Sequence, residues 1–210
     1  VKGFMKQIEV SRATMGRIPT YLRYLRDIEG ETENISATML ARGLGLGEVQ
    51  VRKDLASVSG AGRPKTGYRI CELINALESF LGADGRTEAV LVGAGKLGRA
   101  LLDYSGFGEY GLDIAAAFDA AVGETEKSDS GKPIYPMEQF CGFCRKNNVK
   151  IGVITVPAAQ AQQVCDLLTE NGIKAVWCFA PRTLSVPEGV SVQYENMALS
   201  LAYLKSKAGV

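Results

Sequence analysis

The chain has 210 residues, of which 46% are hydrophobic and 22% charged, and its formal net charge is +1. This composition is ordinary for a globular protein, is long enough for two small domains, and excludes a disordered or strongly basic chain. No apolar run approaches the roughly 20 residues that span a bilayer, and the first residues lack the apolar core and cleavage site of a signal peptide. We therefore expect a cytoplasmic protein with no membrane partner.

Five cysteines and no histidine restrict metal and redox chemistry. Cys71, Cys165 and Cys178 stand in apolar stretches, which predicts buried, reduced thiols and no disulfide framework. Cys141 and Cys144 have the spacing of a redox or zinc pair, but a zinc site needs two more ligands, and the pair follows a segment that already looks helical. We expect two incidental thiols and no metal.

The first third of the chain has the pattern of a helix-turn-helix. Apolar side chains recur at helical spacing over residues 11–28, 35–42 and 48–57. Glycines separate the second and third segments, as in the short turn of such a motif. The expected buried stripe of the first helix is Met15, Ile18, Leu22 and Leu25, the expected cap of the second is Ser36, and the glycines expected to break it are Gly43, Gly45 and Gly47.

The third predicted helix carries polar residues opposite its apolar stripe. Gln50 and Lys53 lie one turn apart with Arg52 beside them, a set suited to base edges and phosphates in a major groove. The alternative is a three-helix bundle with a polar surface.

A basic loop follows this helix. In residues 60–68, glycines and a proline flank Arg63 and Lys65, which predicts a hairpin wing whose basic tip reaches an adjacent groove. Five basic residues lie between positions 50 and 69 against one acid, Asp54. Such a cluster suits phosphate binding, although charge alone also fits a solvated face.

A glycine-rich turn follows at the centre of the chain. Gly93, Gly95 and Gly98 have G-x-G-x-x-G spacing after an apolar strand and before a helix that continues to about residue 104. In a dinucleotide site the first glycine allows the bend, the second lets backbone amides approach a pyrophosphate, and the third lets helix and strand touch. The helix start adds free N–H groups and a favourable dipole. A glycine-rich turn without a ligand is the alternative.

A carboxylate stands where the cofactor ribose is expected. The apolar run 112–118 ends in Asp119, and Ala120 and Ala121 follow with no adjacent arginine. This pattern favours NAD(H) over NADP(H), because a 2′-phosphate would meet the carboxylate without a cation. Strands over 149–156 and 173–179, joined by a helix, complete a parallel sheet.

The predicted fold is α/β, with a winged helix-turn-helix domain over 1–84, a Rossmann-type parallel-sheet domain over 85–194 and a C-terminal helix over 195–210. No room remains for a substrate domain. Without histidine, Tyr104 is the only attractive proton donor or acceptor, so an NAD-dependent oxidoreductase is the disfavoured alternative.

Motifs along the whole chain resemble those of the Rex family, bacterial redox-sensing transcriptional repressors. They are 19–23 (PTYLR), 49–55 (VQVRKDL), 67–68 (GY), 93–98 (GAGKLG), 104–108 (YSGFG), 118–119 (FD), 155–157 (TVP) and 179–181 (FAP). The resemblance implies a homodimer that binds an inverted-repeat DNA operator with NAD⁺ or no cofactor, leaves it when NADH binds, and catalyses no reaction.

The motifs and the resemblance together predict three sets of site residues. The cofactor contacts are Gly93, Gly95, Lys96, Leu97, Gly98, Asp119, Thr155, Val156, Pro157, Tyr104, Phe179 and Ala180; the DNA contacts are Gln50, Arg52, Lys53, Arg63 and Lys65; the switch residues are Arg23, Tyr104, Asn196 and Met197.

The C-terminal segment has an apolar face, because Met197, Leu201 and Leu204 recur at helical spacing. This face either packs on its own subunit or, as the resemblance implies, crosses into the partner subunit and carries the cofactor state to the recognition helices.

The chain also departs from the family pattern. Many members have an aspartate and an aromatic residue where this chain has Asn196 and Met197, an asparagine in place of Cys178, and small residues in place of Pro64 and Lys65. A neutral asparagine cannot supply the carboxylate interactions that the resemblance implies for switching. A repressor with weakened or lost NADH sensing is therefore a further alternative.

Overall fold

The structure, a computed structural model, describes residues 10–64, 66–82 and 87–208. Its contacts divide the chain into two units, the first comprising Val1–Arg86 with Gly108–Gly111 and the second Thr87–Phe107 with Leu112–Val210. The expected domain boundary between residues 84 and 85 lies outside the described residues.

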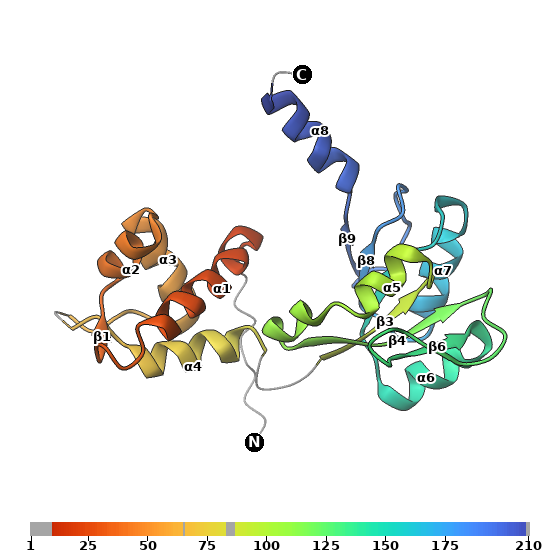
Figure 1. Ribbon diagram of the computed structural model, residues 1–210, viewed down its shortest axis with the longest axis horizontal. Coiled ribbons are helices and arrows are strands. Elements are labelled where there is room, and N and C mark those ends of the chain that lie inside the picture. The colour runs from red at the N-terminus through yellow and green to blue at the C-terminus, as the bar shows by residue number, and fades with distance from the viewer. Residues whose placement is uncertain (1–9, 65, 83–86, 209–210) are drawn as a thin grey trace. The chain divides into compact units, whose positions relative to one another are not determined.

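The described part of the N-terminal unit contains four α-helices and a two-stranded antiparallel sheet (Figure 1). The elements are α1 (Arg12–Asp27), β1 (Asn34–Ile35), α2 (Ala37–Leu44), α3 (Glu48–Ser59), β2 (Tyr68–Arg69) and α4 (Ile70–Phe80). All four helices contribute to one apolar core, which includes Ile18, Leu40, Leu55 and Leu73.

Local hydrogen bonds and one glycine set the bounds of α2. The Ser36 hydroxyl accepts the backbone N–H of Met39 at 3.1 Å, as the predicted cap requires. Gly45 ends the helix in the left-handed region with φ +64°. The prediction that Gly43 breaks the helix was wrong. Gly43 lies inside α2, where a Cβ would lie 2.2 Å from the Tyr24 hydroxyl, so this glycine makes room for an aromatic side chain.

The predicted buried stripe of α1 was wrong at Met15, which is exposed. The buried face runs instead through Thr14, Ile18, Tyr21 and Leu25. Met15 lies at the edge of this face, whereas Thr14 lies within it and its hydroxyl donates to buried Asp54 at 3.1 Å.

The C-terminal unit contains a seven-stranded sheet in the order β5-β6-β4-β3-β7-β8-β9. The strands are β3 (Thr87–Val92), β4 (Leu112–Asp119), β5 (Glu126–Lys127), β6 (Pro133–Pro136), β7 (Ile151–Ile154), β8 (Ala175–Cys178) and β9 (Ser191–Tyr194). Every pair is parallel except β5 with β6. The strand order reverses at β3, and ligands of open α/β sheets bind beside such a point.

Helices cover both faces of this sheet. They are α5 (Lys96–Leu102), α6 (Phe140–Asn147) and α7 (Ala158–Glu170), and 3₁₀ turns cover Ser105–Tyr110 and Met137–Gln139. Side chains of β3 alternate, so Val90 and Val92 join the core formed with α6 and α7, whereas Ala89 and Leu91 join the core that includes Leu102 of α5. The sequence did not predict β5, β6 or β9, which are short strands toward the sheet margins.

The last helix, α8 (Met197–Ala208), follows β9 and runs away from the sheet (Figure 1). Its apolar side chains Met197, Leu199, Leu201 and Leu204 are 61–70% exposed. This face does not pack on the C-terminal unit, and its crossing into a partner subunit stays a prediction.

The cysteines are all free thiols. Cys165 and Cys178 are buried as expected, but Cys71 is exposed because it lies in the first turn of α4 on the side away from the core. Burial raises the pKa of Cys144 to about 11, which leaves this thiol of the Cys141–Cys144 pair unreactive. Within the described residues, no cluster of three or more potential metal ligands occurs, and no helix has the length and apolarity to cross a membrane.

Candidate functional site

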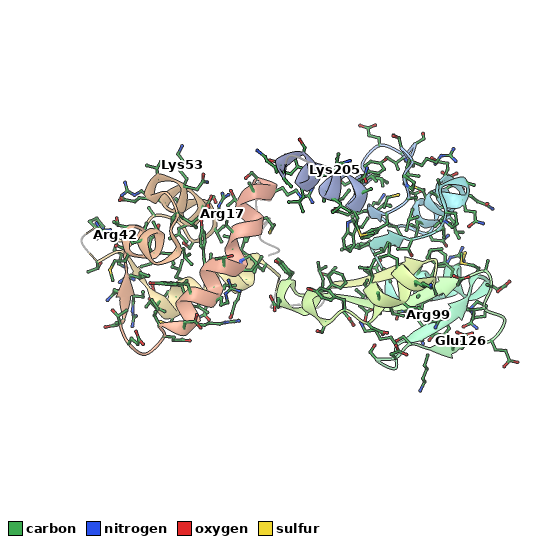
Figure 2. The ribbon with its side chains drawn as sticks, turned by 45° about the horizontal axis from the view of Figure 1, so that its top comes forward. Arg17, Arg42, Lys53, Arg99, Glu126 and Lys205 are labelled. Carbon is green, nitrogen blue, oxygen red and sulfur yellow. The ribbon has the colours of Figure 1, made fainter. Side chains whose placement is uncertain are left out.

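The exposed face of α3 carries three of the predicted DNA contacts. Gln50, Arg52 and Lys53 are exposed, whereas Val51 and Leu55 on the opposite face are fully buried. Lys53 points outward from the unit in Figure 2. The helix thus exposes an amide and two cations, of which Arg52 lines the groove beside the wing.

The wing is a hairpin closed by Arg63 and Gly67. The Arg63 N–H donates to the Gly67 carbonyl at 2.7 Å, and the Gly67 N–H returns a bond of 2.9 Å. Arg63 and Gly67 thus face each other across the hairpin, and the Arg63 guanidinium lies 3.5 Å from Glu72. Lys65 lies outside the described residues.

A groove of about 530 Å³ lies among the start of α2, the side of α3 and the wing. Arg52 and Arg63 line it, together with Ser36, Thr38 and Tyr68. Guanidinium and hydroxyl groups are the usual partners of phosphate oxygens. Arg52 also pairs with Glu48 one turn earlier.

Asp54 is the one acid within the basic segment 50–69, but its carboxylate does not neutralise the positive charge on the exposed surface of that segment. Its side chain is 2% exposed and forms an ion pair with Arg17 of α1 at 2.7 Å. Burial by itself would raise the pKa of Asp54, but hydrogen bonds from Arg17, Tyr21, Gln50 and Thr14 outweigh it and lower the pKa to about 2. The exposed charge of α3 and the wing is consequently basic.

The glycine-rich turn joins β3 to α5, and its three glycines have different surroundings. Gly93 has φ +104°, which favours glycine. A Cβ on Gly98 would lie 2.0 Å from the Gly93 carbonyl oxygen, so only glycine lets the helix approach the strand this closely. A Cβ on Gly95 would meet no atom within 4 Å, because this residue faces an open cleft.

Asp119 ends β4 beside the turn. One carboxylate oxygen accepts the Ala94 N–H at 2.6 Å and the other accepts the Ala121 N–H at 2.8 Å. A carboxylate has about four acceptor positions, so each oxygen can accept one further hydroxyl. Asp119 therefore fixes the turn and still has acceptor positions for a ligand in the cleft.

The cleft has a volume of about 880 Å³, within the range of small-molecule sites. Six of the twelve predicted cofactor residues line it, namely Gly93, Gly95, Asp119, Thr155, Val156 and Pro157. The Thr155 hydroxyl donates to the Gly93 carbonyl at 2.6 Å and so ties the end of β7 to the turn.

The other six predicted cofactor residues are not in the cleft lining. Lys96 and Leu97 start α5, Gly98 packs on the turn, and Ala180 is buried. Tyr104 is exposed with its ring 5.0 Å from that of Phe107, and Phe179 packs on Trp177 at 4.5 Å. Their contacts with a cofactor stay predictions.

The sequence did not single out several lining residues. Met137, Gln160, Val164 and Leu167 also line the cleft. Only their positions in the sequence could have identified them. Met137 directly follows a strand of the sheet, and the other three lie on the helix that begins after Pro157.

An arginine lies beside the turn residue that Asp119 contacts, although no arginine is adjacent to Asp119 in sequence. Arg99 Nε donates to the Ala94 carbonyl at 3.0 Å, and its Nη2 lies 2.8 Å from Glu126 of β5 (Figure 2). The carboxylate of Glu126 neutralises the positive charge of Arg99. The cleft lining itself, as far as the structure describes it, contains three acids and no basic residue.

The predicted switch residues belong to both units. Arg23 is an exposed residue of α1, whereas Tyr104, Asn196 and Met197 belong to the C-terminal unit. The Asn196 side-chain oxygen accepts the Leu199 N–H at 3.0 Å, so this residue caps α8. A joint switch of these four residues stays a prediction.

These features define a two-unit protein in which a winged helix-turn-helix precedes a Rossmann-type domain with an intact dinucleotide fingerprint. Residues 9–56 match the family described as "Putative DNA-binding protein N-terminus", and residues 84–182 match the family described as "CoA binding domain". The redox-sensing transcriptional repressor Rex of Porphyromonas gingivalis strain W83 is 38% identical over 204 residues, which cover 97% of this chain and 94% of that protein.

The chain belongs to the Rex family of redox-sensing transcriptional repressors. This membership confirms the resemblance, the fold class and the expectation of a regulator in place of an enzyme. A solved structure of RSP, a Rex-family repressor, in complex with β-NAD⁺ and operator DNA has a TM-score of 0.83 at 31% identity and covers 95% of this chain and 92% of that chain. RSP with β-NADH has a TM-score of 0.75 at 30% identity and covers 95% and 94%.

Proposed function

We propose that this protein is a transcriptional repressor that binds an inverted-repeat DNA operator as a homodimer and leaves it when NADH binds the Rossmann-type domain. The observation that carries the proposal is that this Rex-family chain combines two features. One is an exposed basic helix, and the other is a cleft that Asp119, the proposed ribose ligand, lines beside the glycine-rich turn. Such a protein acts where the chromosome and the NAD(H) pool meet, which in a bacterium is the cytoplasm.

The cleft fits NAD(H) on three counts. Gly95 leaves open space where backbone must approach a pyrophosphate, and Gly98 brings α5 against β3. Asp119 has free acceptor positions for ribose hydroxyls. Coenzyme A carries a phosphate on its adenosine ribose, which this carboxylate would repel, so the geometry favours NAD(H) over the ligand in the name of the matched domain family.

The homodimer explains two uncovered apolar surfaces of the C-terminal unit. One is the exposed face of α8. The other is a depression of about 320 Å³ on the sheet, lined by residues that include Phe107, Ile151 and Trp177. Exchange of α8 between two subunits would bury its apolar face, which a monomer leaves in water at a cost of about 25 cal/mol per Å².

A second candidate function is a repressor whose operator binding no longer responds to NADH. Asn196 favours it, because this neutral side chain is occupied in capping α8 and supplies no charge toward Arg23 or Tyr104. Binding of NADH without release of DNA is the behaviour that this candidate predicts.

One titration distinguishes the two functions. Fluorescence anisotropy of a labelled operator, selected from random duplexes by the full-length protein, is measured with NADH, with NAD⁺ and without cofactor. A sensor loses about 100-fold in DNA affinity with NADH alone, which requires NADH to favour the released state by about 2.7 kcal/mol. Equal affinity in all three conditions, with NADH binding seen by calorimetry, identifies the insensitive repressor.

A further inference from the structure

We propose that Asp54 holds the side-chain amide of Gln50 so that the recognition helix reads an adenine in the major groove and rejects guanine at that position. The inference rests on the proposed function, because it assigns a base to a helix taken to bind DNA. Gln50 is the residue that would touch the base, and Asp54 is a positioning residue behind it.

Asp54 is a fixed point inside the N-terminal unit. Its two oxygens accept five hydrogen bonds, and four of them come from α1. Arg17 donates from Nε at 2.7 Å and from Nη2 at 2.9 Å, the Tyr21 hydroxyl donates at 2.7 Å, and the Thr14 hydroxyl donates at 3.1 Å. A carboxylate held by a two-point guanidinium contact and two hydroxyls keeps its place on α3.

The fifth bond reaches the exposed face of α3. Gln50 Nε2 donates to Asp54 Oδ1 at 3.2 Å across one helical turn. Because an ionised carboxylate only accepts, it must face the NH₂ group of the amide and not the carbonyl. The contact therefore sets which way the amide of Gln50 is turned.

The groups left on Gln50 match one base. With one N–H used by Asp54, the amide retains one donor and its carbonyl acceptor. Adenine presents an acceptor at N7 and a donor at N6 in the major groove, which this pair satisfies together. Guanine presents two acceptors, N7 and O6, and would need both N–H groups of the amide. Holding the amide beforehand also reduces the side-chain entropy lost on binding.

The test uses the full-length protein without cofactor and an operator selected from random duplexes. Dissociation constants are measured for every single base-pair change, for the wild type, Gln50→Met, Asp54→Ala and the double variant. We expect one position where adenine is preferred over guanine by about 5- to 150-fold, the range of one good two-point contact. Gln50→Met should abolish this preference and Asp54→Ala should weaken it. The double variant should match Gln50→Met, because Asp54 acts through Gln50.

Tyr21→Phe is the matched control. It removes a donor from the Asp54 oxygen that Gln50 does not contact, so it should cost stability and leave the adenine preference intact. A preference that survives Gln50→Met, or an equal loss in Tyr21→Phe and Asp54→Ala, overturns the proposal. If the wild type selects no sequence at all, the proposed function itself fails.

A second measurement does not depend on the folding of Asp54→Ala. In the wild type, ¹⁵N relaxation of the side-chain amides should show the Gln50 NH₂ group to be more ordered than that of Gln163, an exposed glutamine on α7. Equal mobility of the two amides would overturn the proposal.

Discussion

Gly95 and Gly98 lie three residues apart in one turn, but their missing side chains serve different needs. A Cβ on Gly98 would collide with the Gly93 carbonyl, whereas a Cβ on Gly95 meets only open space at an ordinary φ of −68°. Gly98→Ala should therefore destabilise the C-terminal unit by about 1–3 kcal/mol. Gly95→Ala should leave its stability unchanged and weaken NADH binding by crowding the pyrophosphate.

Trp177, the single tryptophan of the chain, reports unfolding of the unit that contains the cleft. Thermal melts followed by its fluorescence test stability, and calorimetry tests NADH affinity. Unchanged NADH affinity in Gly95→Ala would place the pyrophosphate elsewhere.

Glu126 balances a positive charge beside the glycine-rich turn. It pairs with Arg99, whose Nε is bonded to the turn residue that Asp119 also contacts. Glu126→Gln should raise NADPH affinity by up to about fivefold, since an exposed ion pair of this kind is worth at most about 1 kcal/mol. Glu124→Gln, which removes the same charge two residues earlier, is the control in a calorimetric comparison. An equal gain in both variants would show only a change in net charge.

The lowered pKa of Asp54 makes the N-terminal unit sensitive to acid. Because its pKa falls from 3.8 to about 2 on folding, its ionised form stabilises the folded state above pH 3.8, and this contribution disappears as the pH falls toward 2. The linked free energy is about 2 kcal/mol. Hydrogen exchange should show faster opening of α1 and α3 in Asp54→Ala than in the wild type at pH 6, with a difference that shrinks below pH 4. A constant difference at all pH values would contradict the assignment.

At the scale of elements, α3 should act as the recognition helix. Lys53→Ala should weaken operator binding by about 1–3 kcal/mol if the ammonium reads a base, or weaken binding to all sequences and reduce the salt slope by about 1 if it meets a phosphate. Lys146→Ala, an exposed cation on α6, is the control for general charge effects. Anisotropy titrations at several salt concentrations separate these outcomes, and no change on either measure would remove α3 from the groove.

At the scale of the whole molecule, α8 should hold two subunits together. Deletion of residues 195–210 should yield a monomer with weakened nicotinamide binding and almost no operator binding, because a two-fold operator requires two recognition helices at fixed spacing. Leu201→Glu, which places a charge on the exposed apolar face, should act in the same direction without shortening the chain. A truncated protein that sediments as a stable dimer and keeps its operator affinity would refute the exchange of α8.

The sequence by itself determined features that depend on neighbours in the chain. The Ser36 cap and the glycine-rich turn follow from local hydrogen bonding and glycine geometry. Asp119 is 25 residues from Ala94, but the order strand, helix, strand places the ends of β3 and β4 side by side and so predicts their contact. The family motifs also depend on local spacing, so they can be recognised from the sequence alone.

Only the tertiary structure decided which distant residues meet. Periodicity predicted Met15 as part of the buried face of α1, but in the structure Met15 is exposed and Thr14 is buried, with its hydroxyl bonded to Asp54, 40 residues away. Likewise, Arg99 pairs with Glu126 beside the turn that Asp119 contacts, and the residues adjacent to Asp119 in sequence did not predict this ion pair. The physical reason is that a side-chain contact between elements depends on how their faces pack, and packing is a property of the assembled core that no single segment contains.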